Sequence, residues 1–164
     1  MQREDDPAGG EDRDWSTAGA PALIAHILAR YHAVHRQQLP ELIRLSRKVE
    51  QTHAQHADCP AGLADHLIVM SQELESHMRK EEDILFPMLT RRMGARAQMP
   101  IRVMRAEHDE HRAELRRLEA LTGGITPPQD ACSTWQALYQ GLAAFRQDLI
   151  THIHLENDIL FEDA

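Results

Sequence analysis

Histidine is the residue type whose number and spacing in this sequence could do chemistry. The chain has 11 histidines among 164 residues. The pattern H-x-x-x-E-x-D-I-L-F occurs twice, beginning at His77 and at His152, and H-x-x-H-R occurs twice, beginning at His32 and at His108. His32 precedes His77 by 45 residues, and His108 precedes His152 by 44. The chain is therefore interpreted as two related helical hairpins, each offering one histidine from its first helix and a histidine with a glutamate from its second.

The two glutamates, Glu81 and Glu156, each follow a histidine by four residues. That spacing places both side chains on one helix face, within ~6 Å of each other. Buried carboxylates are costly unless they are paired or coordinate a metal. Two histidines per metal with two bridging carboxylates make a di-iron arrangement with open positions for a bridging oxygen and for O2 or NO. The predicted metal ligands are His32, His77, Glu81, His108, His152 and Glu156.

The identity of the metal follows from the ligand types. Nitrogen and oxygen ligands without thiolate favour Fe or Mn, although Zn would also bind. His35 and His111 lie three residues after predicted ligands and are either additional ligands or supports that orient them. His53 follows His32 by 21 residues, about 31 Å along a continuous helix, and is left outside the site. Cys59 and Cys132 are interpreted as ordinary turn cysteines in preference to a second, thiol-containing site.

Four amphipathic helices must position these side chains. Apolar residues recur at helical spacing, and Gly- and Pro-rich turns separate the segments. Pro40 is expected to kink the first helix, and Val103 and Met104 are both expected to face inward. The pattern predicts an all-α, antiparallel up-down-up-down four-helix bundle with helices over residues 22–57, 63–92, 101–121 and 131–161. At ~1.5 Å per residue, the four histidines then fall roughly 10–23 Å from one end of the bundle.

Composition limits the other functions. With 18 Lys and Arg against 26 Asp and Glu, the net charge of -8 argues against nucleic-acid binding. No run of ~18 apolar residues could span a membrane, and the acidic N-terminus does not resemble a signal peptide. We expect a cytoplasmic protein, a monomer or a weak dimer, with a flexible acidic segment over 1–21 and one domain over 22–164.

The chain resembles the hemerythrin-like di-iron proteins of the iron-sulfur cluster repair family, also called repair of iron centres. The residues that carry this resemblance include Arg30-Tyr31-His32, Leu39-Pro40-Glu41-Leu42-Ile43, Glu81-Glu82, Ile84-Leu85-Phe86-Pro87, Glu107-His108-Asp109-Glu110, Thr126-Pro127-Pro128 and Leu155-Glu156-Asn157. The resemblance implies two iron ions with a bridging oxo or hydroxo group, the four histidines as iron ligands, and both glutamates bridging. Oxygen-carrying hemerythrins are less similar, since they place H-x-x-x-H and H-x-x-x-x-D on the last two helices. Many family members also begin with a small domain bearing adjacent cysteines, which the first 21 residues are too few to form.

The function implied is repair of iron-sulfur clusters damaged by nitrosative or oxidative stress, through iron donation or NO handling. Damaged iron-sulfur proteins and O2 or NO are the expected partners. The alternative is an O2 or NO carrier or sensor that keeps its iron. We do not expect a conventional enzyme, although reduction of NO or peroxide at the iron pair is a third option.

Overall fold

The computed structural model describes residues 13–164, which form four long helical rods. The first rod contains α1 (Ala20–Ile27), the π-helical turn η3 (Leu28–His32) and α2 (Ala33–Thr52). The second contains α3 (Leu63–Lys80), the π-helical turn η4 (Glu81–Leu85) and α4 (Phe86–Thr90). The third is α5 (Gln98–Leu121), and the fourth is α6 (Ser133–His154) with the π-helical turn η6 (Leu155–Leu160). Two short 3-10 helices, η2 (Trp15–Thr17) and η5 (Gly94–Ala97), complete the described chain.

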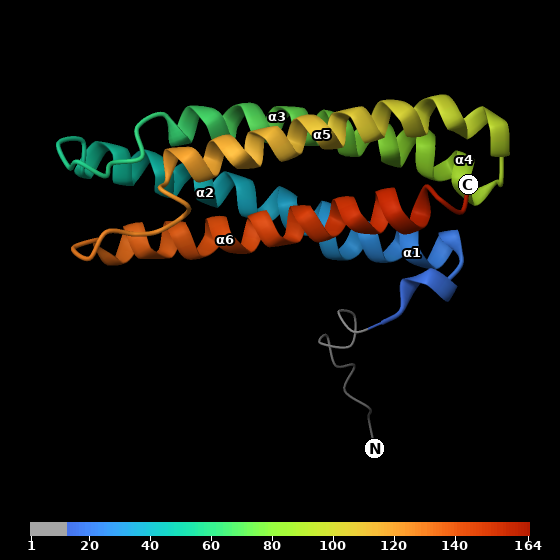
Figure 1. Ribbon diagram of the computed structural model, residues 1–164, viewed down its shortest axis with the longest axis horizontal. Coiled ribbons are helices and arrows are strands. Elements are labelled where there is room, and N and C mark those ends of the chain that lie inside the picture. Colours follow the sequence, from blue (N-terminus) through green and yellow to red (C-terminus); the bar gives the residue numbers. More distant parts are fainter. Residues whose placement is uncertain (1–12) are drawn as a thin grey trace, which may run out of the picture.

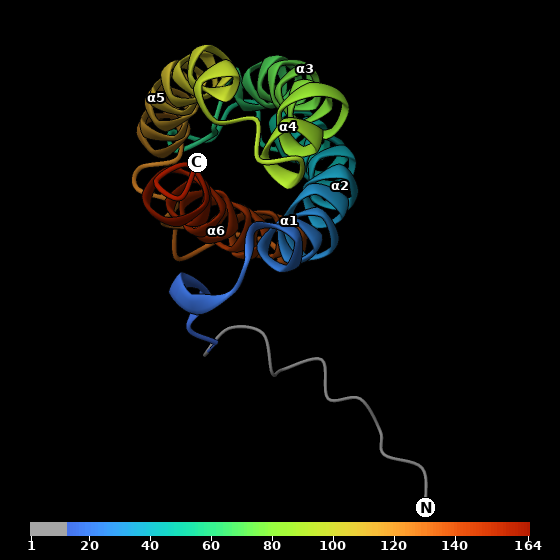
Figure 2. The ribbon, with the colours of Figure 1, turned by 90° about the vertical axis from the view of Figure 1, so that its right-hand side faces the viewer.

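The rods run antiparallel along the long axis of the molecule (Figure 1) and surround a common interior when seen end-on (Figure 2). α2 packs against α3 and α6, and α5 also packs against α3 and α6. No strand occurs between residues 13 and 164. The predicted antiparallel four-helix bundle is confirmed.

Two apolar clusters fill the interior, because each rod presents one apolar stripe to the others. The distal cluster surrounds Trp135 and Phe145 and includes Leu67, Leu118 and Leu138. The proximal cluster lies toward α1 and α4 and includes Leu23, Leu85, Phe86, Ile101 and Phe161. Along each rod, the predicted histidine ligand falls where the sequence passes from one cluster to the other. The fold thus places a polar level between the two apolar clusters.

Helix boundaries agree with those expected from the sequence to within three residues, except that the first rod ends at Thr52 and not at residue 57. Departures from α geometry occur at the π-helical turns. Pro40 lies inside α2, which is α-helical on both sides of it. The irregular turns are instead the three π-helical turns, one of which directly precedes the helix that begins Phe86-Pro87. Pro87 has no backbone N–H to donate, so the regular series of helix hydrogen bonds already lacks one bond at this position. The wider π-helical turn just before it is compatible with that missing bond.

Two expectations need correction. Val103 is 43% exposed, whereas its neighbour Met104 is 2% exposed, so the prediction that both face inward is wrong for Val103. Consecutive helical residues point about 100° apart, and here the core takes only one of the two. The flexible segment predicted over 1–21 falls partly on residues 1–12, which lie outside the described residues. Within 13–21, Trp15 is buried in the proximal cluster and α1 begins at Ala20, so packed structure begins before residue 22.

None of the helices within residues 13–164 combines the length and the apolar character needed to cross a bilayer.

Candidate metal centre

The four rods bring the six predicted ligands to one buried level. Each of these side chains is 1% exposed or less: His32, His77, Glu81, His108, His152 and Glu156. They form two overlapping groups, in each of which one potential ligand atom per residue lies within 4.8 Å of all the others. Both groups contain Glu81 and Glu156. Each carboxylate therefore lies where it could bridge two neighbouring cations.

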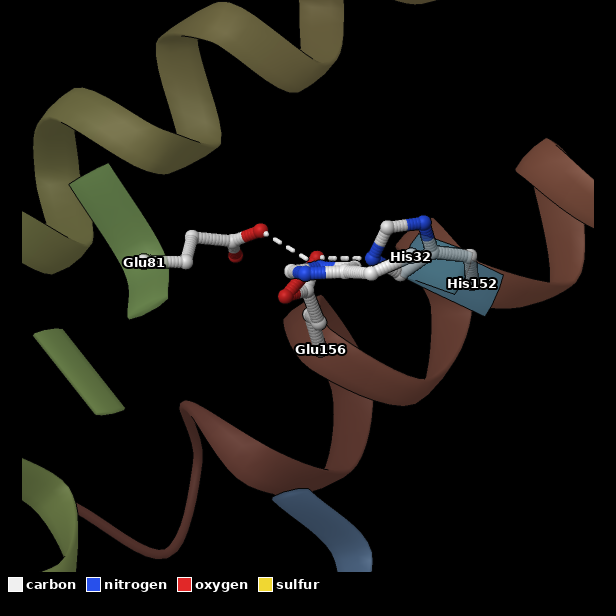
Figure 3. Close-up of side chains that lie close together, drawn as sticks. All are labelled: His32, Glu81, His152 and Glu156. Atoms are coloured by element: carbon white, nitrogen blue, oxygen red, sulfur yellow. Dashed lines mark ion pairs between the residues drawn. The ribbon is translucent and has the colours of Figure 1, made fainter. Parts of the chain in front are cut away.

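The first group joins His32 and His152 to the two glutamates. Figure 3 shows these side chains pointing toward one another from the first, second and fourth rods. The Nε2 atom of His32 lies 3.2 Å from Oε1 of Glu81. The Nε2 atom of His152 lies 3.0 Å from Oε1 of Glu156. In both residue pairs the imidazole offers the nitrogen farther from its own backbone.

The second group joins His77 and His108 to the same two glutamates. The Nε2 atom of His77 lies 3.3 Å from Oε1 of Glu81, and that of His108 lies 3.2 Å from Oε1 of Glu156. The two Nε2 atoms lie 3.1 Å from each other. The internal repeat of the sequence thus becomes a near-symmetric arrangement around the two carboxylates.

Unsatisfied polar atoms at this level test whether the residues fit a metal. The Nε2 atoms of His32 and His152 and all four carboxylate oxygens of Glu81 and Glu156 are buried without a hydrogen-bond partner. Buried polar groups are almost always hydrogen-bonded in folded proteins, because an unpaired group loses its hydration without compensation. Lone pairs that converge without a donor are what a cation requires. The donor set therefore fits metal binding.

The other ring nitrogen of each histidine is held by a polar partner. Nδ1 of His32 lies 2.7 Å from Oε2 of Glu82, and Nδ1 of His77 lies 3.0 Å from Oε1 of Glu107. Nδ1 of His108 lies 2.7 Å from Oδ1 of Asn157. An ionised carboxylate and an amide oxygen can only accept, so these contacts place the proton on Nδ1 and leave the Nε2 lone pair facing the centre.

Cationic side chains hold the two supporting carboxylates in place. Arg36 donates to both oxygens of Glu82, with distances of 2.8 and 3.0 Å, and Lys80 forms an ion pair with Glu107. The pKa of Glu82 is lowered because hydrogen bonds from Arg36 and His32 outweigh the effect of burial. These carboxylates therefore stay charged and available as acceptors.

His152 has a different kind of support, which runs through several side chains. Its Nδ1 lies 3.1 Å from Nε2 of His35, and Nδ1 of His35 lies 3.3 Å from Oε1 of Gln38. Gln38 donates to Asp148 at 2.9 Å, and Arg30 donates to the other oxygen of Asp148 at 3.0 Å. His35 is thus a support for His152 and is absent from both groups of candidate ligands.

Burial sets the protonation of the site. It lowers the pKa of His32 and that of His77 to about 4, and that of His111 to about 3. These imidazoles are therefore neutral near pH 7, the form in which histidine binds metals. Burial and the negative charge of Glu156 raise the pKa of Glu81 well above its usual value. A cation between the two carboxylates would remove the repulsion that causes this shift.

Local helix geometry contributes to the convergence. His32 ends the π-helical turn η3, Glu81 begins η4, and Glu156 lies in η6. A π-helical turn widens the helix by one residue per turn, and such turns occur often at functional sites. Three of the six candidate ligands thus come from turns that depart from the regular α-helix. The expectation from regular helices predicted the common level but not these turns.

The remaining histidines lie outside the two groups. His111 is buried with its ring centroid 4.8 Å from that of His77. His53 caps the far end of α2, where its Nε2 lies 3.2 Å from Sγ of Cys132. His154 is exposed and lies 2.6 Å from Asp158, and His66 lies 2.8 Å from a backbone oxygen of α5. Cys59 and Cys132 are free thiols.

Comparison with known protein families identifies the fold at this point. The Hemerythrin HHE cation binding domain matches residues 23–164. The chain belongs to the hemerythrin HHE family. The hemerythrin match covers all four rods and all six candidate ligands, so metal binding, which the buried histidine and glutamate cluster also supports, is a property of this domain.

Curated relatives of this hemerythrin domain carry a more specific name. The iron-sulfur cluster repair protein YtfE of Pectobacterium atrosepticum is 51% identical over 152 residues, covering 93% of this chain and 69% of the relative. The YtfE protein of Yersinia pseudotuberculosis is 50% identical over 151 residues, covering 92% of this chain and 68% of the relative. That of Dickeya chrysanthemi is 48% identical over 153 residues, covering 93% and 69%. The resemblance expected from the motifs is confirmed.

Sequence reasoning named His35 as a possible support but missed the other residues that support the ligands. Glu82 and Glu107 are each adjacent in sequence to a predicted ligand, and Asn157 follows Glu156. A signal was present, since a carboxylate or amide beside a ligand is the kind of group that orients an imidazole. Gln38 and Asp148, which continue the support of His152 beyond His35, had no such signal, because they lie on two different rods and 110 residues apart in the sequence.

Proposed function

We propose that this hemerythrin domain holds a pair of iron ions and takes part in the repair of iron-sulfur clusters damaged by nitric oxide or oxidants. The observation that carries the proposal is the sharing of Glu81 and Glu156 by two overlapping groups of ligand atoms. Two carboxylates common to two histidine pairs suit two cations better than one. The names of the curated relatives at about 50% identity support iron-sulfur cluster repair as the process.

The proposal assigns a role to each of the six residues. His32 and His152 would bind one iron through Nε2, and His77 and His108 would bind the other. Glu81 and Glu156 would bridge the two ions, which an oxo or hydroxo group would also join. Nitrogen and oxygen ligands without thiolate suit iron of this kind. The pair would supply redox change and open coordination positions for a small ligand such as NO or O2.

The side chains around the candidate ligands orient the imidazoles and keep water away from the centre. Glu82, Glu107, Asn157 and His35 keep each imidazole in the tautomer that presents Nε2. The proximal and distal clusters exclude water above and below the polar level. Glu107 is 19% exposed, so solvent reaches the support of His77 more easily than that of the fully buried His152 partner, His35. The protein thus holds the centre firmly while keeping it close to the surface on one side.

The partners in this proposal are damaged iron-sulfur proteins, to which the domain would give iron or from whose surroundings it would remove NO. A cytoplasmic location accords with the two free thiols, since that compartment keeps cysteines reduced. We propose a monomer or a weak dimer.

Metal analysis with a double substitution tests the proposed site. We expect two irons per chain after anaerobic loading, and loss of both in the Glu81→Ala, Glu156→Ala variant. The control is His154→Ala with Asp158→Ala, which removes an exposed ion pair on the fourth rod, on either side of Glu156 in the sequence. Unchanged iron content in the glutamate variant would contradict the assignment.

Iron transfer tests the proposed process. The loaded chain is mixed with an iron-depleted apoprotein of a [4Fe-4S] enzyme, sulfide and a thiol, and recovery of cluster absorbance is followed. We expect recovery with the wild-type chain and with the His154 control, and none with the glutamate variant. Retention of both irons by the wild-type chain under these conditions, with reversible binding of gas, would instead favour a carrier or sensor.

A further inference from the structure

The two copies of the internal repeat differ at the position just before the first histidine. In H-x-x-H-R, the residue before the first histidine is Tyr31 in one copy and Glu107 in the other. Glu107 accepts a hydrogen bond from His77, as described above. Tyr31 instead stacks on His152, with ring centroids 5.5 Å apart and an interplanar angle of 15°. The first copy of the repeat therefore has an oxidisable ring where the second copy has a carboxylate.

The other ligands that stack on an aromatic ring have phenylalanine as the neighbour. Phe86 stacks on His32 at 5.7 Å, and Phe161 stacks on His108 at 6.0 Å. Phenylalanine is far harder to oxidise than tyrosine, because it has no hydroxyl group that can lose a proton as the electron leaves. Only packing is needed to explain the two phenylalanines. Tyr31 differs from them in chemistry while occupying a similar stacking position.

A row of contacting aromatic rings continues from Tyr31 toward the surface. His26 lies edge-on to Tyr31, with centroids 5.7 Å apart, and Trp15 stacks on His26 at 4.2 Å. Trp15, His26 and Tyr31 together line a surface pocket of about 280 Å³, with Arg30 and Asp148 on its wall. The row of rings therefore begins next to the candidate ligand His152 and ends at Trp15, in a pocket that a small molecule can enter.

We propose that Tyr31, His26 and Trp15 form an electron path by which surface reductants protect the metal centre from excess peroxide. The inference rests on the proposed iron pair. When peroxide reacts with a centre that has no more electrons to give, Tyr31 and Trp15 supply them. One hydrogen peroxide takes two electrons and two protons and gives two waters. The phenol and the indole each lose one electron and one proton and become neutral radicals, which thiols entering the pocket reduce again.

Charges beside the rings determine how the electron leaves. The guanidinium of Arg30 lies 5.0 Å from the Tyr31 ring centroid, and that of Arg13 lies 4.5 Å from that of Trp15. A neighbouring positive charge disfavours a cation radical, so each ring must lose its proton together with its electron. In this proposal both protons pass to solvent that enters the pocket lined by Tyr31 and Trp15. His26 is half-buried between the two rings and keeps them in contact without being oxidised itself.

Mass spectrometry of trapped radicals tests the path. The iron-loaded full chain is treated with hydrogen peroxide and a nitrone spin trap, and adducts are located on peptides. The chain contains two tryptophans and two tyrosines. Trp135 and Tyr139, which lie in the distal cluster, are therefore internal controls. We expect adducts on Trp15 and Tyr31, with Trp135 and Tyr139 at background.

Two variants separate a path from independent surface oxidation. Tyr31→Phe, which keeps the stacking ring, is expected to reduce the Trp15 adduct to the background level of Trp135. The matched variant Tyr139→Phe is expected to leave it unchanged. Iron content is measured on the same samples. A chain without two irons contradicts the proposed function and this inference with it, whereas an iron-loaded Tyr31→Phe chain that retains its Trp15 adduct overturns the electron path alone.

Discussion

Replacing Glu81 by glutamine is expected to stabilise the metal-free chain while weakening its iron binding. Both oxygens of Glu81 are buried without a hydrogen-bond partner, and an oxygen of Glu156 lies within 4.8 Å in each ligand group. Because burial and Glu156 raise the pKa of Glu81, the wild-type carboxyl must take up a proton when the metal-free chain folds at neutral pH. Glutamine is neutral without taking up a proton and places an N–H donor beside Glu156, and a hydrogen bond to a charged group contributes about 1.5–3 kcal/mol. We therefore expect a gain of roughly 2 kcal/mol in the free energy of unfolding, which for a chain of this size raises the melting temperature by about 4–8 °C.

Thermal unfolding followed by circular dichroism, with and without a chelator, measures this effect. In chelator, Glu81→Gln should melt above the wild type. With iron the order should reverse, because a ligand at 100 times its dissociation constant adds about 2.7 kcal/mol only to a chain that binds it. The control is Asp83→Asn, an exposed change in the same π-helical turn, which should stay within about 0.5 kcal/mol of wild type. A metal-free Glu81→Gln chain less stable than wild type would refute the reasoning.

Three further outcomes are expected from the burial and hydrogen bonds of other residues. Asn157→Ala removes the acceptor at Nδ1 of His108 and should weaken iron affinity by about 10–100-fold in a chelator competition, with unchanged helix content. Burial, and then a hydrogen bond with Glu73, raise the pKa of Glu114 from 4.5 to about 8, so the folded chain holds a proton that the unfolded chain releases above 4.5. Stability from this group is complete below 4.5 and is lost as the pH rises through about 8; urea unfolding across this range should show that decline, and Glu114→Gln should flatten it. Val103→Lys should leave the melting temperature nearly unchanged, whereas Met104→Lys should lower it markedly; equal effects would contradict the burial of Met104.

Much of this protein could be predicted from local patterns. The period of the apolar residues predicted four helices, and the turns between them predicted an antiparallel bundle, because short connections leave consecutive rods side by side. Val103 shows the limit of such patterns. An apolar residue next to the core stripe is indistinguishable from a core residue until the rotation of the helix is known.

In the candidate site, too, some features could be predicted from the sequence and others depend on the tertiary structure. The sequence by itself predicted the six candidate ligands and their common level, because the repeat relates the histidines to one another and the rise per residue converts spacing into depth. The tertiary structure decided how the candidate ligands are grouped, because the grouping of His32 with His152 joins the first rod to the last. It also decided the roles of His35 and Tyr31. Both lie one turn or less from His32 in sequence, yet both contact His152, because packing between rods brings together side chains that no spacing along one chain relates.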